Sequence, residues 1–197
     1  MFVKNSTGIL KKVLLCKPAY LKITPINEIA KKWIDKPLDL NKMEAEHRAL
    51  VKAYEDNGVQ VAFLEADPKL PYLVFARDFG GCIREGYILG KFREPIRHEE
   101  QARYKARMEA LGVPLVVEVK QGFFEGGDFF FLDDTTLAVG MIARSDAEGV
   151  EEIRRGLAPL GYTVIGVPAK PQYLHLDMCF NLVSENLAVG YPPALPE

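Results

Sequence analysis

The side chains of this sequence best suited to chemistry are four acids and one histidine. They are Asp78, Glu125, Asp128, His175 and Asp177. Carboxylates hold a planar cation such as guanidinium through paired, in-plane hydrogen bonds, and a histidine can pass a proton to or from a reacting group. If the fold brings these residues together, the sequence predicts a site for a guanidinium-like ligand.

Three of these acids occupy one register of an internal repeat about fifty residues long. The copies begin at Asp78, Asp128 and Asp177 and close at Gly90, Gly140 and Gly190. A fixed period in this range is typical of a domain built from repeated supersecondary units. Because each acid lies at the start of a first strand, a ring of such units would direct several carboxylates to one centre.

The elements that must position these acids follow an α/β order. Strands are predicted at 9–16, 59–64, 73–77, 82–84 and 175–183, the last with His175 and Asp177 on one face. Helices are predicted at 98–111, at 145–157 and from an N-cap at Asn41 to Gly58, after a loop with one helical turn. The repeat favours an α/β propeller, with helices outside and strands inside, over an open α/β sheet.

The domain prediction follows from the continuity of the repeat. No linker divides the units, so we predict a single α/β-propeller domain over 1–197 with about four repeat units. The fourth unit stops after its second strand, so the last unit is expected to be missing. Unpaired edges of an open ring would favour self-association, which is compatible with a homo-oligomer.

Composition excludes several classes of function. The formal net charge is -2 and no basic tract occurs, which argues against a nucleic-acid partner. No apolar run reaches membrane-spanning length and no signal peptide is present, so we expect no membrane partner. The cysteines, Cys16, Cys82 and Cys179, are odd in number and lack CxxC spacing, which indicates free thiols and a cytoplasmic location.

Four motifs of the chain resemble those of the guanidine-modifying superfamily, the penteins. The motifs are FARDFGG, FFEGGDFF, ARSDAEG and LHLDMCF, within about residues 72–190. That superfamily includes dimethylarginine dimethylaminohydrolase, arginine deiminase, agmatine deiminase and the amidinotransferases. The resemblance implies a five-bladed, pseudo-symmetric α/β propeller. It also implies a cofactor-free hydrolase or amidinotransferase acting on the guanidino group of arginine or an arginine derivative, through a covalent thiouronium intermediate.

The resemblance also assigns roles to residues of this chain. Asp78 matches the acid that grips the guanidinium nitrogens, and Glu125 matches the glutamate beside the reacting carbon. His175 matches the general acid and base. Arg97 and Arg144 match arginines that receive the substrate's α-carboxylate, and we expect them at the rim of the site.

Two further acids are interpreted separately. Asp177 stands where dimethylarginine dimethylaminohydrolases tend to carry lysine, and a second carboxylate there favours an unmethylated guanidinium. Asp128 we interpret as an anchor for its own loop, in which Gly126 and Gly127 let the backbone approach a ligand closely. Tyr72 stands where the family has an additional acid.

The nucleophilic cysteine of the family lies in the last unit, so we expect it beyond Glu197 and expect these 197 residues alone to be inactive. Cys16 and Cys82 read as core residues. Cys179 would lie about 13 Å along an extended strand from His175, too far for contact, so it is not assigned as the nucleophile.

Two alternatives to the enzyme remain open. One is a non-catalytic pentein-fold protein that binds a small guanidino ligand. The other is a metal-dependent hydrolase that uses the acids as ligands. A metal site requires a denser cluster than the sequence offers, where only His175 with Asp177 has suitable spacing, so we predict no metal.

Overall fold

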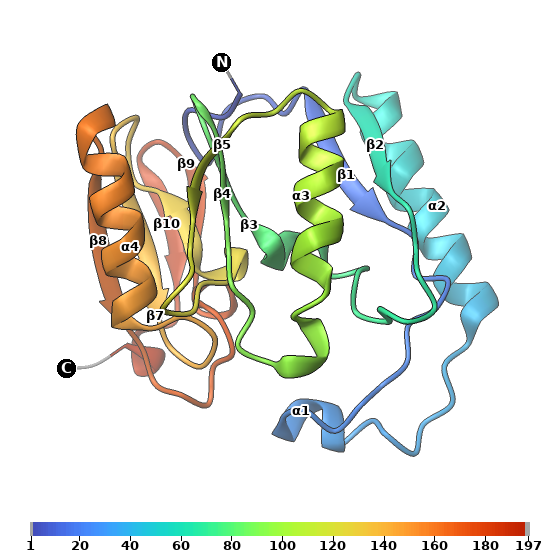
Figure 1. Cartoon of the computed structure of the whole chain (residues 1–197). Helices are drawn as coiled ribbons and strands as arrows, with labels where there is room; N and C mark the ends of the chain where they lie inside the picture. Colours follow the sequence, from blue (N-terminus) through green and yellow to red (C-terminus); the bar gives the residue numbers. More distant parts are fainter. Residues whose placement is uncertain (1, 196–197) are drawn as a thin grey trace. The chain divides into compact units, whose positions relative to one another are not determined.

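The structure, a computed structural model, describes residues 2–195 (Figure 1). The chain forms two compact units. Unit 2 is Ile9–Ala76, and unit 1 combines Met1–Gly8 with Arg77–Glu197. Whether these two units form the single domain predicted for residues 1–197 is not tested by this division, so the single domain stays a prediction. All the acids and the histidine singled out above belong to unit 1.

Unit 2 contains one parallel strand pair and its connecting helix. Strand β1 (Lys12–Cys16) pairs with β2 (Gln60–Leu64), and α2 (Leu40–Asp56) lies between them in the chain. The predicted cap at Asn41 is wrong, because Asp39 caps α2 by accepting a hydrogen bond from the Lys42 amide at 3.0 Å. The expected single helical turn is α1 (Glu28–Lys31).

The first sheet of unit 1 is a hairpin extended by a crossover. Strand β3 (Gly80–Ile83) pairs antiparallel with β4 (Gly86–Leu89), which pairs in parallel with β5 (Leu115–Glu118). Helix α3 (Glu100–Ala110) makes the crossover. A parallel pair needs such a connection because the chain must return to the same end of the sheet.

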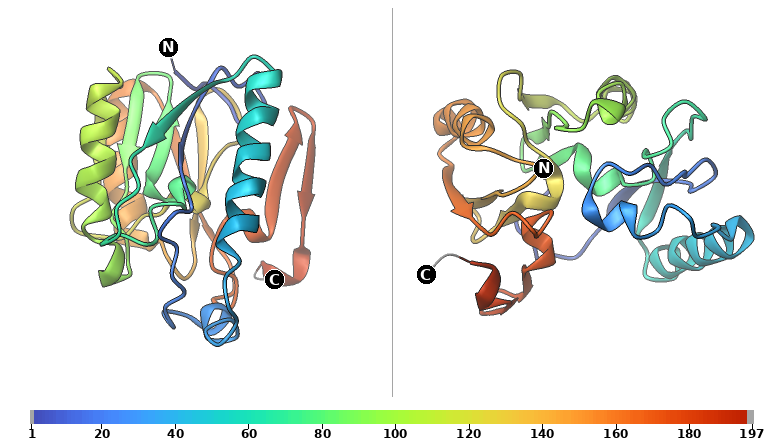
Figure 2. Two further views of the ribbon diagram at one scale, coloured as in Figure 1. Left: turned by 90° about the vertical axis from the view of Figure 1, so that its right-hand side faces the viewer. Right: turned by 90° about the horizontal axis from the view of Figure 1, so that it is seen from below.

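The second sheet repeats this order. Strand β6 (Phe129–Phe131) pairs antiparallel with β7 (Thr136–Met141), which pairs in parallel with β8 (Thr163–Pro168). Helix α4 (Ala147–Leu157) makes the crossover and packs against both β8 and β5. Seen from below, α3 and α4 lie on the outer side of the strands that they connect (Figure 2). The predicted repeat is therefore present in these two copies.

A third hairpin consists of β9 (Phe180–Ser184) and β10 (Leu187–Gly190). Among residues 2–195 no third strand joins this pair. Its side chains Val183, Leu187 and Val189 are 56%, 56% and 62% exposed, whereas all four residues of β4 are buried. The fold is thus mixed α/β with several small sheets, and its closure as a five-bladed propeller stays a prediction.

One turn of 3₁₀-helix precedes each hairpin. These turns are η1 (Ala76–Phe79), η3 (Gly126–Asp128) and η5 (Leu176–Met178). The predicted strands at 73–77 and 175–178 are therefore wrong. The turns are closed by short-range bonds, such as that from the Asp128 amide to the Glu125 carbonyl at 3.0 Å, which an apolar alternation does not reveal.

The segment at residues 2–8 runs beside strands that lie far along the chain. The amides of Phe2 and Val3 donate to the carbonyls of Arg84 and Ile83 at 3.1 and 3.3 Å. The Ser6 hydroxyl donates to the Phe131 carbonyl at 3.2 Å and accepts from the Phe131 amide at 2.9 Å. We call residues 2–8 the N-terminal strap.

The apolar core of unit 1 fixes the hairpins against the helices. Its members include Ile83, Ile88, Phe124, Phe129, Leu137, Val139, Val150, Ile153, Leu157 and Val164. Tyr104 of α3 stacks on Phe79 of η1 with ring centroids 4.3 Å apart, which holds the turn that carries Asp78. Within residues 2–195 no helix has the length and apolar character needed to cross a membrane.

Candidate functional site

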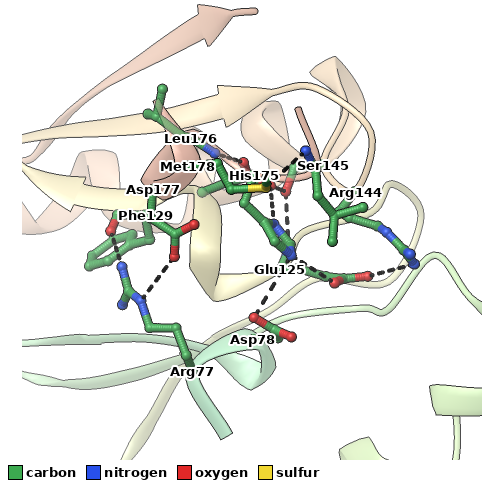
Figure 3. Close-up of polar contacts among 12 residues, drawn as sticks. Arg77, Asp78, Glu125, Phe129, Arg144, Ser145, His175, Leu176, Asp177 and Met178 are labelled. Atoms are coloured by element: carbon green, nitrogen blue, oxygen red, sulfur yellow. Dashed lines mark hydrogen bonds and ion pairs between the residues drawn. The ribbon is translucent and has the colours of Figure 1, made fainter. Parts of the chain in front are cut away.

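The short turns before the hairpins bring three of the predicted site residues together. His175 Nε2 lies 3.6 Å from Glu125 Oε2 and 3.8 Å from Asp78 Oδ1 (Figure 3). The side chains of Glu125, His175 and Asp78 are 1%, 8% and 14% exposed. Residues separated by almost a hundred positions therefore form one largely buried cluster, which we call the acidic cluster.

The ring of His175 is oriented by Asp128. The Oδ2 atom of Asp128 lies 3.3 Å from His175 Nδ1, and its Oδ1 atom accepts the Leu176 amide at 2.8 Å. With Nδ1 directed at this carboxylate, Nε2 faces Glu125 and Asp78. Asp128, interpreted from the sequence as an anchor for its own loop, thus also holds the segment at His175.

Electrostatics favour the charged form of His175. Burial disfavours the cation, but the hydrogen bond to Asp128 and the charges of Asp78, Asp128 and Glu125 outweigh it. Together they raise the pKa of His175 above its ordinary value. A raised pKa favours the protonated ring, which is the form that can donate a proton to a leaving group.

Two glycines allow the close packing beneath the ring. A Cβ on Gly127 would lie 2.7 Å from Cγ of His175, and one on Gly126 would lie 2.1 Å from the Gly80 carbonyl oxygen. The atoms that a side chain at either position would meet belong to the protein, and a close approach of this backbone to a ligand stays a prediction. They permit η3 to pack directly on the histidine ring and on the β3 backbone.

Glu125 is a buried carboxyl between two arginines. Its Oε1 atom accepts the Arg93 amide at 3.2 Å, and its carboxylate lies 3.8 Å from Arg97 Nη1 and 4.0 Å from Arg144 Nη1. Burial raises the pKa of Glu125 to about 7, with Asp78 adding to the rise and Arg97, Arg144 and His175 opposing it. Glu125 can therefore change its protonation state near neutral pH.

Arg97 is buried, and its predicted position at the rim is wrong. Its Nη1 atom donates to Asp78 Oδ2 at 2.6 Å, while Nε and Nη2 donate to Glu100 Oε2 at 3.1 and 2.9 Å. The turn η2 (Pro95–Arg97) directs the side chain inward, and Glu100 follows three residues later on α3. Burial lowers the pKa of Arg97, but Asp78 and Glu100 raise it further, so the guanidinium stays charged.

Arg144 is also buried rather than at a rim, with 4% of its surface exposed. Its Nη1 atom pairs with Glu94 Oε1 at 2.9 Å. Both arginines thus act first as counter-charges for buried acids. A role for either in binding a substrate carboxylate stays a prediction.

Asp177 lies directly after the segment that carries His175, and the arginine nearest to its carboxylate is Arg77 rather than Arg97 or Arg144. Its Oδ2 atom is 3.9 Å from Arg77 Nε, and Arg77 Nη2 donates to the Phe129 carbonyl at 2.9 Å (Figure 3). Burial raises the pKa of Asp177, while His175 and Arg77 oppose this rise. The side chain is 31% exposed, so it remains open to a ligand from solvent.

Several polar partners in the site were missed by sequence reasoning. They are Arg77, Arg93, Glu94, Glu100 and Ser145. The spacing of Arg97 and Glu100 at the start of a helix was a usable signal, since residues three apart face one another on a helix. Ser145 belongs to the ARSDAEG motif but only the structure shows what it contacts.

The acidic cluster also has the spacing of a candidate metal site. One ligand atom each from Asp78, Glu125 and His175 lie within 4.8 Å of one another. Arg97 pairs with Asp78, and Arg144 lies near Glu125, so these carboxylates already have positive partners in the protein. This set of residues differs from the predicted pair His175 and Asp177, and the prediction that the site binds no metal stays a prediction.

None of the cysteines is poised as a nucleophile. Cys179 is 3% exposed and donates from Sγ to the Leu176 carbonyl at 3.4 Å, and burial, with Asp128 and Asp177, raises its thiol pKa. Burial raises the pKa of Cys82 to about 11. Cys16 is buried in unit 2. The extended geometry expected for Cys179 is wrong, but protonated thiols are poor nucleophiles wherever they lie.

Comparison with known proteins places the chain in a family. The family model described as "N,N dimethylarginine dimethylhydrolase, eukaryotic" matches residues 17–197. The uncharacterized protein YkgA of Bacillus subtilis is 34% identical over 193 residues, which cover 98% of this chain and 66% of YkgA. Arginine deiminase of Bacillus cereus is 31% identical over 138 residues, which cover 64% of this chain and 33% of the deiminase.

A solved structure shows the same fold. The N-terminal domain of ArgZ, an arginine dihydrolase from Cyanobacteria bound to its product, matches with a TM-score of 0.82 and 22% identity. The match covers 95% of this chain and 68% of that domain. This likeness identifies the pentein fold, which the small sheets and crossovers of unit 1 share. The chain spans about two thirds of YkgA and a third of the deiminase.

The buried acidic cluster, the repeated hairpin–helix–strand unit and these comparisons agree with one another. The chain belongs to the N,N-dimethylarginine dimethylhydrolase family, within the pentein superfamily that also contains the arginine deiminases.

Proposed function

We propose that the protein acts on the guanidino group of arginine or an arginine derivative, as a hydrolase or amidinotransferase that forms a covalent thiouronium intermediate. The observation that supports this most directly is the position of His175 Nε2, 3.6 Å from the buried carboxylate of Glu125 and 3.8 Å from the partly buried carboxylate of Asp78. A planar cation with several N–H donors is complementary to such a cluster. The related proteins named as arginine deiminase and arginine dihydrolase support the same substrate class.

Asp78 is the proposed guanidinium ligand. Arg97 holds its Oδ2 atom at 2.6 Å, which leaves Oδ1, the atom facing His175, for the substrate. Glu125, whose pKa is raised to about 7 by burial, would gain a counter-charge when a cation binds. Substrate binding is therefore expected to deprotonate Glu125 at neutral pH, because a nearby positive charge favours the carboxylate.

In the proposed reaction a thiolate attacks the guanidinium carbon. The bond from that carbon to the departing nitrogen then breaks, and the amine leaves with the proton held on His175 Nε2. Water, deprotonated by the now neutral His175, attacks the thiouronium carbon and releases the thiol. The resemblance places the nucleophilic cysteine in the last unit of the family, so the attacking thiol is proposed to be none of Cys16, Cys82 and Cys179. In support, burial raises the thiol pKa of both Cys82 and Cys179, and Cys16 is buried in unit 2.

Asp177 is proposed to select the unmethylated substrate. It reaches solvent, and its pairing with Arg77 at 3.9 Å is loose. A guanidinium nitrogen carrying two hydrogens could replace Arg77 as a donor, whereas a dimethylated nitrogen has no hydrogen to give. Arginine is therefore the preferred ligand over dimethylarginine in this proposal.

A second candidate function is guanidino binding without turnover. The supporting observation is the absence of a poised thiol among the three cysteines of residues 2–195. The two candidates share one ligand class and differ only in product formation.

Calorimetry with L-arginine, L-citrulline and dimethylarginine, alongside assays for citrulline and ornithine, tests the proposal. Citrulline has nearly the same shape as arginine but no charge, so it is the matched control ligand. Arginine binding that exceeds citrulline binding supports a guanidinium site, and product formation distinguishes the enzyme from the binding protein. Equal affinity for arginine and citrulline would overturn the proposal.

A further inference from the structure

One buried side chain of the site has no part in the proposed reaction. Ser145 lies between β7 and α4 and is 1% exposed. Its hydroxyl donates to Asp128 Oδ2 at 2.6 Å and accepts a hydrogen bond from the Glu125 amide at 3.1 Å. Ser145 is therefore bonded both to the acid that orients His175 and to the backbone of the acid that faces it.

The arrangement converges on a single oxygen. Asp128 Oδ2 lies 2.6 Å from Ser145 Oγ and 3.3 Å from His175 Nδ1. The other oxygen, Oδ1, is engaged by the Leu176 amide at 2.8 Å. Because Asp128 is fully buried, water does not compensate for a lost donor, and each hydrogen bond to this carboxylate affects the others.

We propose that Ser145 is a positioning residue for the acid–base pair: its hydroxyl shares Asp128 Oδ2 with the ring of His175 and fixes the backbone that carries Glu125. The inference rests on the proposed function, in which His175 transfers the proton. The hydroxyl holds the plane of the Asp128 carboxylate, so the ring keeps Nε2 directed at the substrate side. It also reduces the negative charge that Oδ2 presents to the ring, since a carboxylate oxygen with a second donor is less basic.

Other charges facing His175 must be included in any test based on its protonation. These are Asp78 from η1, Glu125 and Asp128 at η3, Asp177 from its own turn, and Arg97, Arg144 and Arg77, which pair with these acids. Ser145 is neutral, and within this set its hydroxyl hydrogen-bonds to Asp128 and to the amide of Glu125. Replacing Ser145 changes the hydrogen bonding of the Asp128 carboxylate without adding or removing a charge.

The test is an NMR titration of the histidine rings in the wild-type chain and in Ser145 variants. The sequence has three histidines, so His47→Gln and His98→Gln identify the His175 signal. In Ser145→Ala, Asp128 Oδ2 loses the hydrogen bond from the hydroxyl and interacts more strongly with the ring of His175. The titration midpoint of His175 is therefore expected to rise. In Ser145→Thr, which keeps a hydroxyl, it is expected to stay at the wild-type value. The Glu125 amide is expected to exchange with solvent faster in Ser145→Ala.

An unchanged or lowered His175 midpoint in folded Ser145→Ala would overturn the inference, because a residue needed only for packing would alter stability and not this midpoint. If Ser145→Ala does not fold, Ser145→Cys takes its place, since a thiol is a weaker donor of nearly the same volume and shifts the midpoint in the same direction. The titration uses no substrate. A failure of arginine binding would therefore count against the proposed function and leave this result standing.

Discussion

The Nη1 atom of Arg97 lies 2.6 Å from Oδ2 of Asp78, so a guanidinium of the protein itself occupies one edge of the acidic cluster. The same arginine is fixed from its other side by Glu100, through Nε and Nη2. Asp78 therefore presents one oxygen in a defined orientation, because the other is held. In the proposed function, a guanidinium ligand would bind to the other oxygen of Asp78, Oδ1.

Asp78→Asn is expected to weaken arginine binding by about 2–4 kcal/mol, since it removes a charge-assisted contact and offers a donor where an acceptor is needed. The variant should also lose about 1–3 kcal/mol of unfolding free energy, because buried Arg97 loses a counter-charge. Calorimetry and urea denaturation measure the two effects. Asp56→Asn, which changes an exposed acid paired with Lys52 on α2, is the control. Undiminished arginine affinity in Asp78→Asn would remove Asp78 from the site.

Glu125→Gln is expected to change the pH dependence of stability. The pKa of Glu125 is raised from 4.5 to about 7 in the folded protein, so its contribution to stability is fully present below pH 4.5 and is lost as the pH rises through about 7. Glutamine mimics the protonated acid and still accepts the Arg93 amide. We expect the variant to be more stable than wild type by about 1–3 kcal/mol at pH 8, with this advantage vanishing near pH 4. A stability difference that is the same at both pH values would contradict the assignment.

Gly127→Ala is expected to displace the ring of His175, because the new Cβ would lie 2.7 Å from Cγ. Overpacking of this kind costs about 1–3 kcal/mol, and the His175 ring signals should shift. Gly112→Ala is the matched control, since Gly112 has φ +71° but no atom within 4 Å of a new Cβ. That variant should lose about 1 kcal/mol through backbone strain alone and leave the His175 signals in place.

The thiols of the folded chain are expected to react slowly with a disulfide reagent such as dithionitrobenzoate. Burial raises the thiol pKa of both Cys82 and Cys179, and Cys16 is buried. The chain unfolded in guanidinium should label all three thiols rapidly, which provides the control. A fast-reacting thiol in the folded chain that disappears in Cys179→Ser would show that Cys179 is activated after all.

The exposed apolar side chains of β9 and β10 are expected to drive self-association. Val189→Lys places a charge on β10, where the native valine is 62% exposed, and should lower the apparent mass in sedimentation at high protein concentration. Glu185→Lys, in the turn between the two strands, changes charge without removing apolar surface and serves as the control. Equal self-association of the wild type and Val189→Lys would exclude this face as the cause.

The repeat made part of the fold predictable. Alternation, helical spacing and glycine indicate hairpin strands and helices, so β3, α3 and α4 lie within two residues of their predicted positions. The 3₁₀ turns were missed because an apolar alternation does not reveal the short-range bonds that close them. The turn after His175 is also held by a bond from the Leu176 amide to Asp128, which spans 48 residues and follows no local pattern.

The sequence was enough to predict which residues form the site, but not the ion pairs and hydrogen bonds between them. Asp78, Glu125 and His175 were identified from register and resemblance, and they do converge. Arg97 and Arg144 were expected at a rim because the resemblance matches them to arginines that receive a substrate carboxylate. Their burial depends on Glu100 and Glu94, and a pairing that cancels the cost of desolvation is visible only in three dimensions.

The N-terminal strap has a consequence for how the chain can be divided and for how it folds. Ser6 and Phe131 bond to each other across 125 positions of sequence, so a fragment beginning at Arg77 would leave the Phe131 amide and carbonyl without this partner. Closing so long a loop carries a large entropic cost, and contacts of this separation form slowly. The strap is therefore expected to dock late, after the β6–β7 hairpin that it joins. Its protection against amide exchange should lag behind that of β7 in a refolding experiment.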